Sequence, residues 1–454
     1  MILALFFTWS FLYSLFSFAL TDPNLVLIRF APYQTFQYFM WNTIFTDRLL
    51  LSSLYLLLII FGFGLYSYLL RRLNTPAPNG LVERVENCVT QRSDAFSIGT
   101  IFSGRYKKKL LGYVLILLPL LFSYNALSHD VFNYIFNAKM VVQYQANPHE
   151  KVALDYSTDP WTRFMHNTHT PAPYGYGWTI LSLLPFGLGF GRFFLTWIFF
   201  KLFAFLSIVA LYTALQYLSV ALRRKYLTFL ELALIFCNPL FLIEVVSNAH
   251  NDLWMLIPAI VSLGIVLEVF RKKYVPITWL TLSALALAAS IFVKLATVVL
   301  LPIWIAIVAL HALKLSVLEK LQMKISIPLI TSLLNGGTNM LVDKYAHIIP
   351  LAASFLLFLP LLTARSQQFH PWYLLWPFVW IPFIRNTFWR TLLIAFSFSS
   401  MFRYLPWLYN GGYDGGVLSQ QKSITWGVAL LLLVLMYAIH YSRKSKTQTV
   451  LYEK

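Results

Sequence analysis

The sequence predicts an all-α polytopic membrane protein with about 12 transmembrane helices, a large outer loop and a re-entrant or interfacial segment. Of its 454 residues, 59% are hydrophobic and only 11% are charged, whereas soluble domains carry about 25% charged residues. The net charge is nevertheless +18, and the basic residues lie between long apolar runs. These observations exclude a soluble enzyme, a disordered chain and a disulfide scaffold. The two cysteines, Cys88 and Cys237, provide neither a disulfide framework nor a zinc cluster.

Apolar runs recur along the chain at about the 20-residue length that a helix needs to cross a bilayer. The predicted spans are residues 2–20, 49–70, 110–127, 193–220, 227–246, 253–270, 275–293, 295–313, 346–362, 372–384, 391–405 and 424–440. No Lys or Arg precedes Arg29, whereas a signal peptide begins with a basic segment. We therefore expect the first run to be a retained membrane helix, with a cleaved signal as the alternative.

Lys and Arg predict the orientation, because they collect in cytoplasmic loops. One set of loops holds 24 of the 35 basic residues and the opposite set holds 10, with Lys201 inside a span. The basic side is predicted to be cytoplasmic, and both termini lie on it. Its loop at 71–109 is expected to face anionic membrane lipids, and no nucleic-acid partner is expected.

Two segments are apolar but do not fit as crossings. If residues 174–190 crossed, Arg223, Arg224 and Lys225 would lie outside, so we expect a re-entrant or interfacial segment there, which is tolerated where backbone is buried in protein. Residues 325–342 are expected to lie on the cytoplasmic surface. No internal repeat is visible, so the sequence gives no support to an inverted-repeat transporter.

Polar residues gather on the side opposite the basic loops. The outer loop at 128–173 is long and polar, and an outer loop at 406–423 is also expected. Further polar stretches on this side lie at 248–252, at Lys294 and at 365–373. Six of the nine histidines belong to this side, although only Lys and Arg define the orientation. Because polar groups at membrane depth are costly and mark functional sites, we infer one site at the outer surface.

Asp130 is the strongest candidate for a catalytic residue. It lies at the outer end of the third predicted span, where a carboxylate at an apolar boundary can acquire a raised pKa and act as a general base. An ordinary interfacial carboxylate is the alternative. The adjacent His129 either assists Asp130 or is a solvated interface residue.

The other outer stretches offer groups for binding. His250, Asn251 and Asp252 suit the hydroxyls of a sugar, with a helix-capping turn as the alternative. A second set consists of cations on the same side, which suit a lipid phosphate or merely extend to the membrane interface. That set is Lys294, Arg365 and His370.

Other chemistries find little support in the sequence. His166 and His169 lie three positions apart, and Asp155 and Asp159 four, but neither spacing makes a compelling metal site. There is no P-loop, dinucleotide fingerprint or nucleophile elbow. No cofactor is expected, and metal dependence stays open.

Seven short motifs follow one another in an order that resembles the GT-C superfamily of integral-membrane glycosyltransferases. The closest resemblance is to bacterial polyprenol-phosphate-mannose-dependent mannosyltransferases. The motifs are SHDVFNY at 128–134, ANPH at 146–149, TPAPYGYGW at 170–178, NP at 238–239, NAHND at 248–252, VK at 293–294 and FHPWYLLW at 369–376. Each motif is weak alone, and the ordered set is fairly specific.

The resemblance implies a role for each motif. Asp130 corresponds to the catalytic aspartate of the first large outer loop. The elements that contain Asn147, His149 and Tyr174 shape the site, and those that contain His250 and Tyr373 line it. The family's Pro-Tyr-Gly-Pro is here Tyr-Gly-Tyr-Gly at 174–177, and a single carboxylate replaces an acidic pair in the first motif.

The expected reaction moves a sugar, mannose by the resemblance, from a polyprenyl-phosphate donor to a glycolipid or glycan acceptor on the outer face of the cell membrane. Asp130 would deprotonate the acceptor hydroxyl, and one base without a second catalytic carboxylate favours inversion. Two alternatives stay open at this point. One is a lipid-sugar flippase or transporter, and the other is a cell-surface polysaccharide polymerase or ligase.

Overall fold

The computed structural model describes residues 1–21, 30–75, 104–272, 276–324, 347–363 and 369–452. Every regular element in these ranges is helical, so the predicted all-α class is confirmed. Within these described ranges, six helices are long and apolar enough to cross a membrane, or seven if one bent pair counts as a span, and three shorter apolar helices accompany them. The chain is therefore a multi-pass membrane protein, and the total of about 12 crossings stays a prediction.

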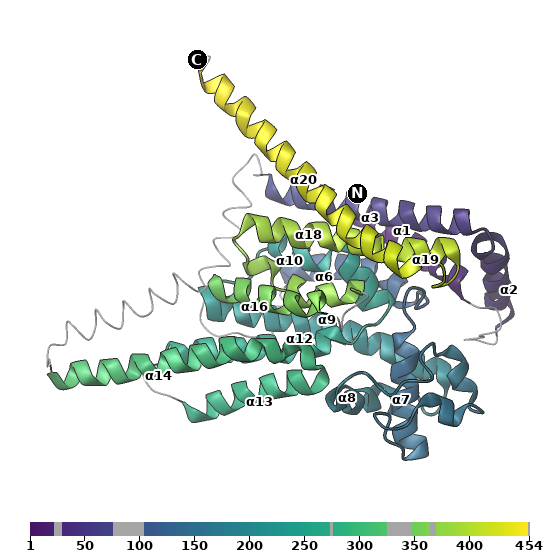
Figure 1. The fold of residues 1–454 in the computed structure, drawn as a ribbon, viewed down its shortest axis with the longest axis horizontal. Coiled ribbons are helices and arrows are strands. Elements are labelled where there is room, and N and C mark those ends of the chain that lie inside the picture. The colour runs from purple at the N-terminus through teal and green to yellow at the C-terminus, as the bar shows by residue number, and fades with distance from the viewer. Residues whose placement is uncertain (22–29, 76–103, 273–275, 325–346, 364–368, 453–454) are drawn as a thin grey trace.

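The helices are arranged as a bundle with a separate group of shorter elements at one end (Figure 1). In chain order the elements are α1 (Ile2–Ser17), η1 (Phe18–Leu20), α2 (Ala31–Met40), η2 (Trp41–Phe45), α3 (Arg48–Asn74), α6 (Gly104–Leu121), α7 (Asp130–Tyr144), η3 (Ala153–Tyr156), η4 (Pro160–Phe164), α8 (Tyr176–Gly187), α9 (Phe193–Arg223), α10 (Phe229–Phe236), α11 (Pro239–Phe241), η5 (Leu242–Ser247), α12 (Asp252–Phe270), α13 (Ile277–Val293), η6 (Leu295–Leu300), α14 (Leu301–Lys324), α16 (Ile348–Phe358), η7 (Leu359–Leu362), η9 (Pro371–Leu374), α17 (Leu375–Phe378), η10 (Ile381–Phe383), α18 (Thr387–Met401), α19 (Tyr404–Asn410) and α20 (Val417–Tyr452).

Close backbone approach holds the N-terminal helices together. Helix α1 packs against α3 and α6, and the buried Trp9 indole donates a hydrogen bond to the Leu58 carbonyl at 2.8 Å. A Cβ at Gly62 would come within 2.6 Å of the Trp9 ring. Small residues permit such packing inside membranes, where lipid tails are as apolar as the side chains and contact geometry drives association.

One span is broken near its middle. Helix α10 starts with a capping box between Thr228 and Glu231 and ends at Phe236. The side chain of Asn238, two residues further on, accepts a hydrogen bond from the Leu240 amide. Pro239 then opens α11, and the two halves meet at a bend of 51°. The second half continues as η5, a π-helix, a form often found at functional sites.

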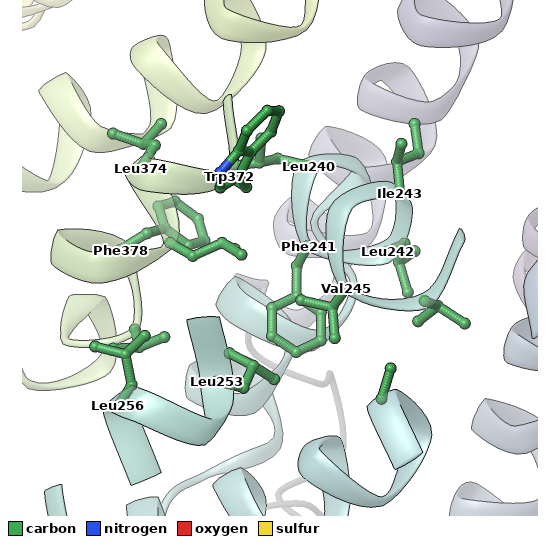
Figure 2. Packing of buried hydrophobic residues seen from close by; sticks show 14 of the residues in the cluster. Leu240, Phe241, Leu242, Ile243, Val245, Leu253, Leu256, Trp372, Leu374 and Phe378 are labelled. Atoms are coloured by element: carbon green, nitrogen blue, oxygen red, sulfur yellow. The ribbon is translucent and has the colours of Figure 1, made fainter. Parts of the chain in front are cut away.

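Helix α11 of the broken span and the start of α12 pack together with α17, which lies far along the sequence. Figure 2 shows Leu240 and Phe241 of α11 facing Leu253 of α12 and Phe378 of α17. All four side chains are buried. This apolar layer fixes the relative positions of η5, the start of α12 and η9, which carry many of the predicted site residues.

The stretch expected as a large outer loop contains a helix and an internal ion pair. Helix α7 occupies residues 130–144, and its Lys139 forms an ion pair with Asp159 in which the side chains are 8% and 2% exposed. The Tyr144 hydroxyl and the Trp161 amide also donate to Asp159, at 2.7 and 2.9 Å. Burial alone raises the pKa of Asp159, but these partners hold it below its usual value.

Asp159→Asn should loosen this region, because removing one partner of a buried ion pair leaves the other charge uncompensated. We expect a loss of about 3 kcal/mol, measured by thermal unfolding in detergent and by protease cleavage within residues 145–175. The lowered pKa means that wild-type stabilisation is present above the unfolded pKa of about 3.9 and is lost as pH falls below it.

Glu268→Gln is the matched control. Its partner Arg224 is 48% exposed and Glu268 is 29% exposed, so this change should cost less than about 1 kcal/mol. Equal losses for the two variants would contradict the proposed anchoring role of Asp159.

Candidate active site

Asp130 is the first residue of α7, and its carboxylate has two partners from other segments. The Tyr174 hydroxyl donates a hydrogen bond to Asp130 Oδ2 at 2.9 Å, and His250 Nδ1 lies 3.6 Å from the same oxygen. The carboxylate remains 18% exposed, so it can reach a ligand. Burial first, and then Asp130, raises the pKa of Tyr174 well above its usual value, which keeps this phenol a hydrogen-bond donor.

Two glycines bring Tyr174 to this position. The Gly175 amide donates to the Val293 carbonyl at 3.0 Å, and a Cβ at Gly175 would collide with the Phe292 carbonyl oxygen. At Gly177 a Cβ would lie 2.8 Å from the Phe292 carbonyl carbon. The Tyr-Gly-Tyr-Gly sequence therefore allows the start of α8 to lie directly on the end of α13.

Lys294 follows α13, at an extended residue between α13 and η6. Its ammonium donates to Asp252 Oδ1 at 2.7 Å, and the Trp376 indole donates to the same oxygen at 2.6 Å. The rings of Tyr174, Tyr373 and Trp376 surround Lys294 at 5.8, 5.1 and 5.1 Å. Burial alone lowers the pKa of Lys294, and Asp252 more than reverses this, so the net shift is upward and the ammonium stays charged.

Several polar atoms in the 248–252 turn are buried without a hydrogen-bond partner among the described residues. They are Asn248 Oδ1, both ring nitrogens of His250, both amide atoms of Asn251 and Asp252 Oδ2. Asn251 occupies the N-cap position of α12 but makes no side-chain cap hydrogen bond, so capping does not account for its side chain. Because buried polar groups are nearly always paired, the amide and carboxylate atoms among them are available to a polar ligand.

Three rings stack across the site. Trp372 lies between His250 and His370, with ring centroids 4.1 and 4.3 Å apart and nearly parallel planes. Burial first, and then Arg403, lowers the pKa of His370 to about 3. His370 is therefore neutral at neutral pH, and it offers a hydrogen bond and a ring face in place of the expected positive charge.

Arg403 is a cation that was not among the site residues predicted from the sequence. It precedes α19 and is only 2% exposed, and its Nη1 has no hydrogen-bond partner in the part of the chain that the structure describes. An unpaired buried charge is costly, so this guanidinium is a strong candidate to bind an anion. The signal in the sequence was an arginine flanked by aromatic residues, at 402–404, next to the predicted outer loop.

The remaining sequence candidates divide into two groups. His129 Nδ1 lies 3.2 Å from the Phe164 carbonyl, and the ring stacks on His166 at 3.7 Å. Burial first, and then His166, lowers the pKa of His129 to about 3, so it is neutral. Asn147 and His149 contact Tyr176 and Thr179 of α8. They therefore fasten the outer segment to α8, and among the described residues they make no hydrogen bond to Asp130.

Arg365 lies outside the described residues. Among the residues that are described, no group of three or more His, Cys, Asp or Glu side chains could hold a metal ion. A groove of about 320 Å³ between α16 and α18 is lined mainly by apolar residues and touches none of the site residues.

Residues 102–310 match a family model described as alpha-(1->6)-mannopyranosyltransferase, N-terminal domain. The match covers a little under half of the chain and includes Asp130, Tyr174, the 248–252 turn and Lys294. No curated protein and no solved structure matches the chain. The predicted resemblance to GT-C mannosyltransferases is thereby confirmed.

Gly175→Ala should reduce both stability and activity, because the added methyl group forces the start of α8 away from α13 and moves Tyr174 from Asp130. We expect a stability loss of about 1–3 kcal/mol, measured by thermal unfolding in detergent, together with a lower rate of sugar transfer. Gly187→Ala is the control, since nothing lies within 4 Å of a Cβ at the other end of the same helix. If both variants behaved alike, the close approach would not be required.

Proposed function

We propose that this chain, which resembles the mannosyltransferase family over residues 102–310, is a membrane enzyme that transfers mannose from a polyprenyl-phosphate donor to a glycolipid or glycan acceptor. The observation that carries the proposal is the position of Asp130. Its partly exposed carboxylate is held by Tyr174 and faces His250, and Asp130 contributes to the raised pKa of Lys294, so a base and a cation share one site.

Asp130 acts as the general base in this proposal. Its carboxylate takes the proton of an acceptor hydroxyl as that oxygen forms a bond to the anomeric carbon. The bond from the anomeric carbon to the phosphate oxygen breaks, and the polyprenyl phosphate leaves with the electron pair. Phosphate is a good leaving group and needs no general acid, and attack from the opposite face inverts the anomeric configuration.

Lys294 and Arg403 are the proposed ligands of the donor phosphate. A phosphate at Arg403 would give its unpaired Nη1 a charged partner, and charge-assisted hydrogen bonds of this kind are short and strong. Fixed cations also stabilise the charge that develops on a leaving phosphate. His370 would donate a hydrogen bond from a neutral ring, and Arg365 stays a proposed ligand from the sequence.

The sugar is proposed to bind at the turn that precedes α12. The unpartnered atoms of Asn251 and Asp252 suit hydroxyl groups, and Tyr373 and Trp376 supply ring faces beside Lys294. We place this site on the outer face, with both termini cytoplasmic, because the basic residues concentrate in the opposite loops.

A flippase or transporter receives less support from the charged residues within the helices. Lys201 of α9 is buried, but its ammonium donates to the carbonyls of Leu120 and Ser247, which lie at the ends of α6 and η5. Glu231 forms a two-bond ion pair with Arg223, at 2.7 and 2.8 Å. Both charges therefore have structural partners, and neither marks a translocation path.

Asp130→Asn should abolish transfer, because an amide cannot accept the acceptor proton. We expect at least a 100-fold loss of rate with purified protein and polyprenyl-phosphate mannose, without loss of membrane insertion. Asp155→Asn, a carboxylate of the same outer segment that caps the Val152 amide, is the control. Transfer by Asp130→Asn near the wild-type rate would refute the assignment.

Arg403→Gln should weaken donor binding, because it removes the charge that faces the phosphate. The KM for polyprenyl-phosphate mannose should rise by roughly 10-fold or more, as expected for loss of about 1.5–3 kcal/mol from a charged hydrogen bond. Arg192→Gln, at an exposed arginine before α9, should leave KM unchanged. An unaltered KM in Arg403→Gln would remove Arg403 from the donor site.

A further inference from the structure

We propose that Glu244 and His250 are positioning residues that act through Asp130, and that they hold the proton taken from the acceptor while the sugar is transferred. This inference rests on the proposed role of Asp130 as the base. It assigns a function to Glu244, a carboxylate inside a broken membrane span that nothing in the sequence motifs singles out.

The three groups lie one behind another from the open side of the site to the interior, although neither ring nitrogen of His250 has a hydrogen-bond partner of good geometry among the described residues. His250 Nδ1 lies 3.6 Å from Asp130 Oδ2, and His250 Nε2 lies 3.2 Å from Glu244 Oε2. The side chains of His250 and Glu244 are 0% exposed, whereas that of Asp130 is 18% exposed. A ligand can therefore reach only the Asp130 end of this row.

Glu244 is fixed in position by other elements. The Tyr404 hydroxyl donates to Glu244 Oε1 at 2.9 Å, and the Asn248 amide donates to Oε2 at 2.9 Å. The His250 backbone amide also donates to the Glu244 carbonyl at 3.1 Å, so η5 and the following turn set the separation of the two side chains. Ala249 adopts a left-handed conformation, with φ of 58°, a strained geometry for a non-glycine residue of the kind that persists at functional sites.

The two distances favour one tautomer of His250. A neutral imidazole has one N–H, and the shorter contact to Glu244 favours Nε2 as its position, which leaves the lone pair of Nδ1 toward Asp130. The same arrangement, with a carboxylate behind a histidine, fixes the tautomer and stabilises the imidazolium in Ser-His-Asp hydrolases. In this protein the group on the other side of the histidine is the Asp130 carboxylate, whereas in those hydrolases it is a serine hydroxyl.

The proton can then be followed through one turnover. The acceptor O–H bond breaks as its oxygen bonds to the anomeric carbon, and the proton passes to Asp130. From Asp130 it moves to His250 Nδ1, where Glu244 stabilises the resulting imidazolium. After the products leave, it returns through Asp130, the exposed member, to solvent. No oxidant, reductant or further reactant is required.

A purely structural role for Glu244 is the competing explanation. Replacing a buried charge by a neutral group is often neutral or stabilising when no charge is needed. A protein that needed only the turn could therefore use an amide at this position, because its oxygen can accept from Asn248 while its NH2 group donates to the hydroxyl oxygen of Tyr404. The carboxylate is required only if His250 carries a positive charge during the reaction.

Glu244→Gln separates these explanations. We expect kcat to fall about 10- to 100-fold, the range typical of second partners that orient a catalytic group, with the KM for polyprenyl-phosphate mannose within about twofold of wild type. Thermal unfolding in detergent should stay near wild type, and Glu244→Asp should restore part of kcat. Glu268→Gln, at the opposite end of the bundle, is the control.

His250→Gln should reduce kcat to a similar extent. The Glu244→Gln/His250→Gln double variant should have a kcat no lower than that of the less active single variant, because the two residues act as a unit. If Glu244→Gln does not accumulate in membranes, kcat and KM are measured for His250→Gln instead, and the same result is expected: a lower kcat with a nearly unchanged KM. A wild-type kcat in either single variant, additive losses in the double variant, or a KM increase with unchanged kcat would overturn the inference.

These outcomes differ from failure of the proposed function. If the wild-type protein does not transfer mannose, or if Asp130→Asn transfers it normally, the proposed function fails. If wild type is active and Asp130→Asn is inactive while Glu244→Gln is normal, only the inference about Glu244 and His250 fails.

Discussion

Hydrocarbon cannot solvate an unpaired polar group, and this constraint decides where the chain can place its charges. Lys201 satisfies it through backbone carbonyls at two helix ends, and Glu244 satisfies it through hydrogen bonds from Tyr404 and Asn248. At the proposed site, buried atoms of Asn251, Asp252 and Arg403 lack hydrogen-bond partners among the described residues, and we interpret them as the groups that a sugar-phosphate would pair.

The site is built where helices start, end or break. Asp130 and Asp252 begin α7 and α12, and Lys294 separates α13 from η6. Glu244 lies in the π-helix after the bend at Asn238, and Arg403 separates α18 from α19. At such points the backbone turns, and side chains of different segments converge on one place. In continuous helices the same residues would be spread along the helix axes.

Close contact and strain maintain this convergence. Gly175 and Gly177 allow α8 to lie on the end of α13, and the apolar layer around Leu240 and Leu253 holds η5 against α12. The ion pair of Lys139 with Asp159 fastens the outer segment to α7. Paired charges therefore serve in both places: Lys139 and Asp159 anchor the outer segment, and Lys294 and Asp252 lie in the proposed site.

The sequence by itself determined the all-α membrane class, since runs of about 20 apolar residues have few other stable forms. It also identified Asp130, His250, Asp252 and Lys294 as polar groups at apolar boundaries, and the structure brings them together as two pairs, His250 beside Asp130 and Lys294 beside Asp252. Both inferences depend on local composition, which the sequence contains directly.

Only the tertiary structure decided which of these groups act on one another. Glu244 pairs with Tyr404, 160 positions away, and no periodicity relates them. Arg403 became a candidate because its burial and its unpaired Nη1 are properties of packing, and His370 was expected to be a cation until its burial beside Arg403 made it neutral. Asn147 and His149 were expected to shape the site, but their neighbours in the fold are Tyr176 and Thr179, so they fasten the outer segment to α8. Charge, solvation and hydrogen bonding depend on neighbours in space, and the fold, not the order of residues, supplies those neighbours.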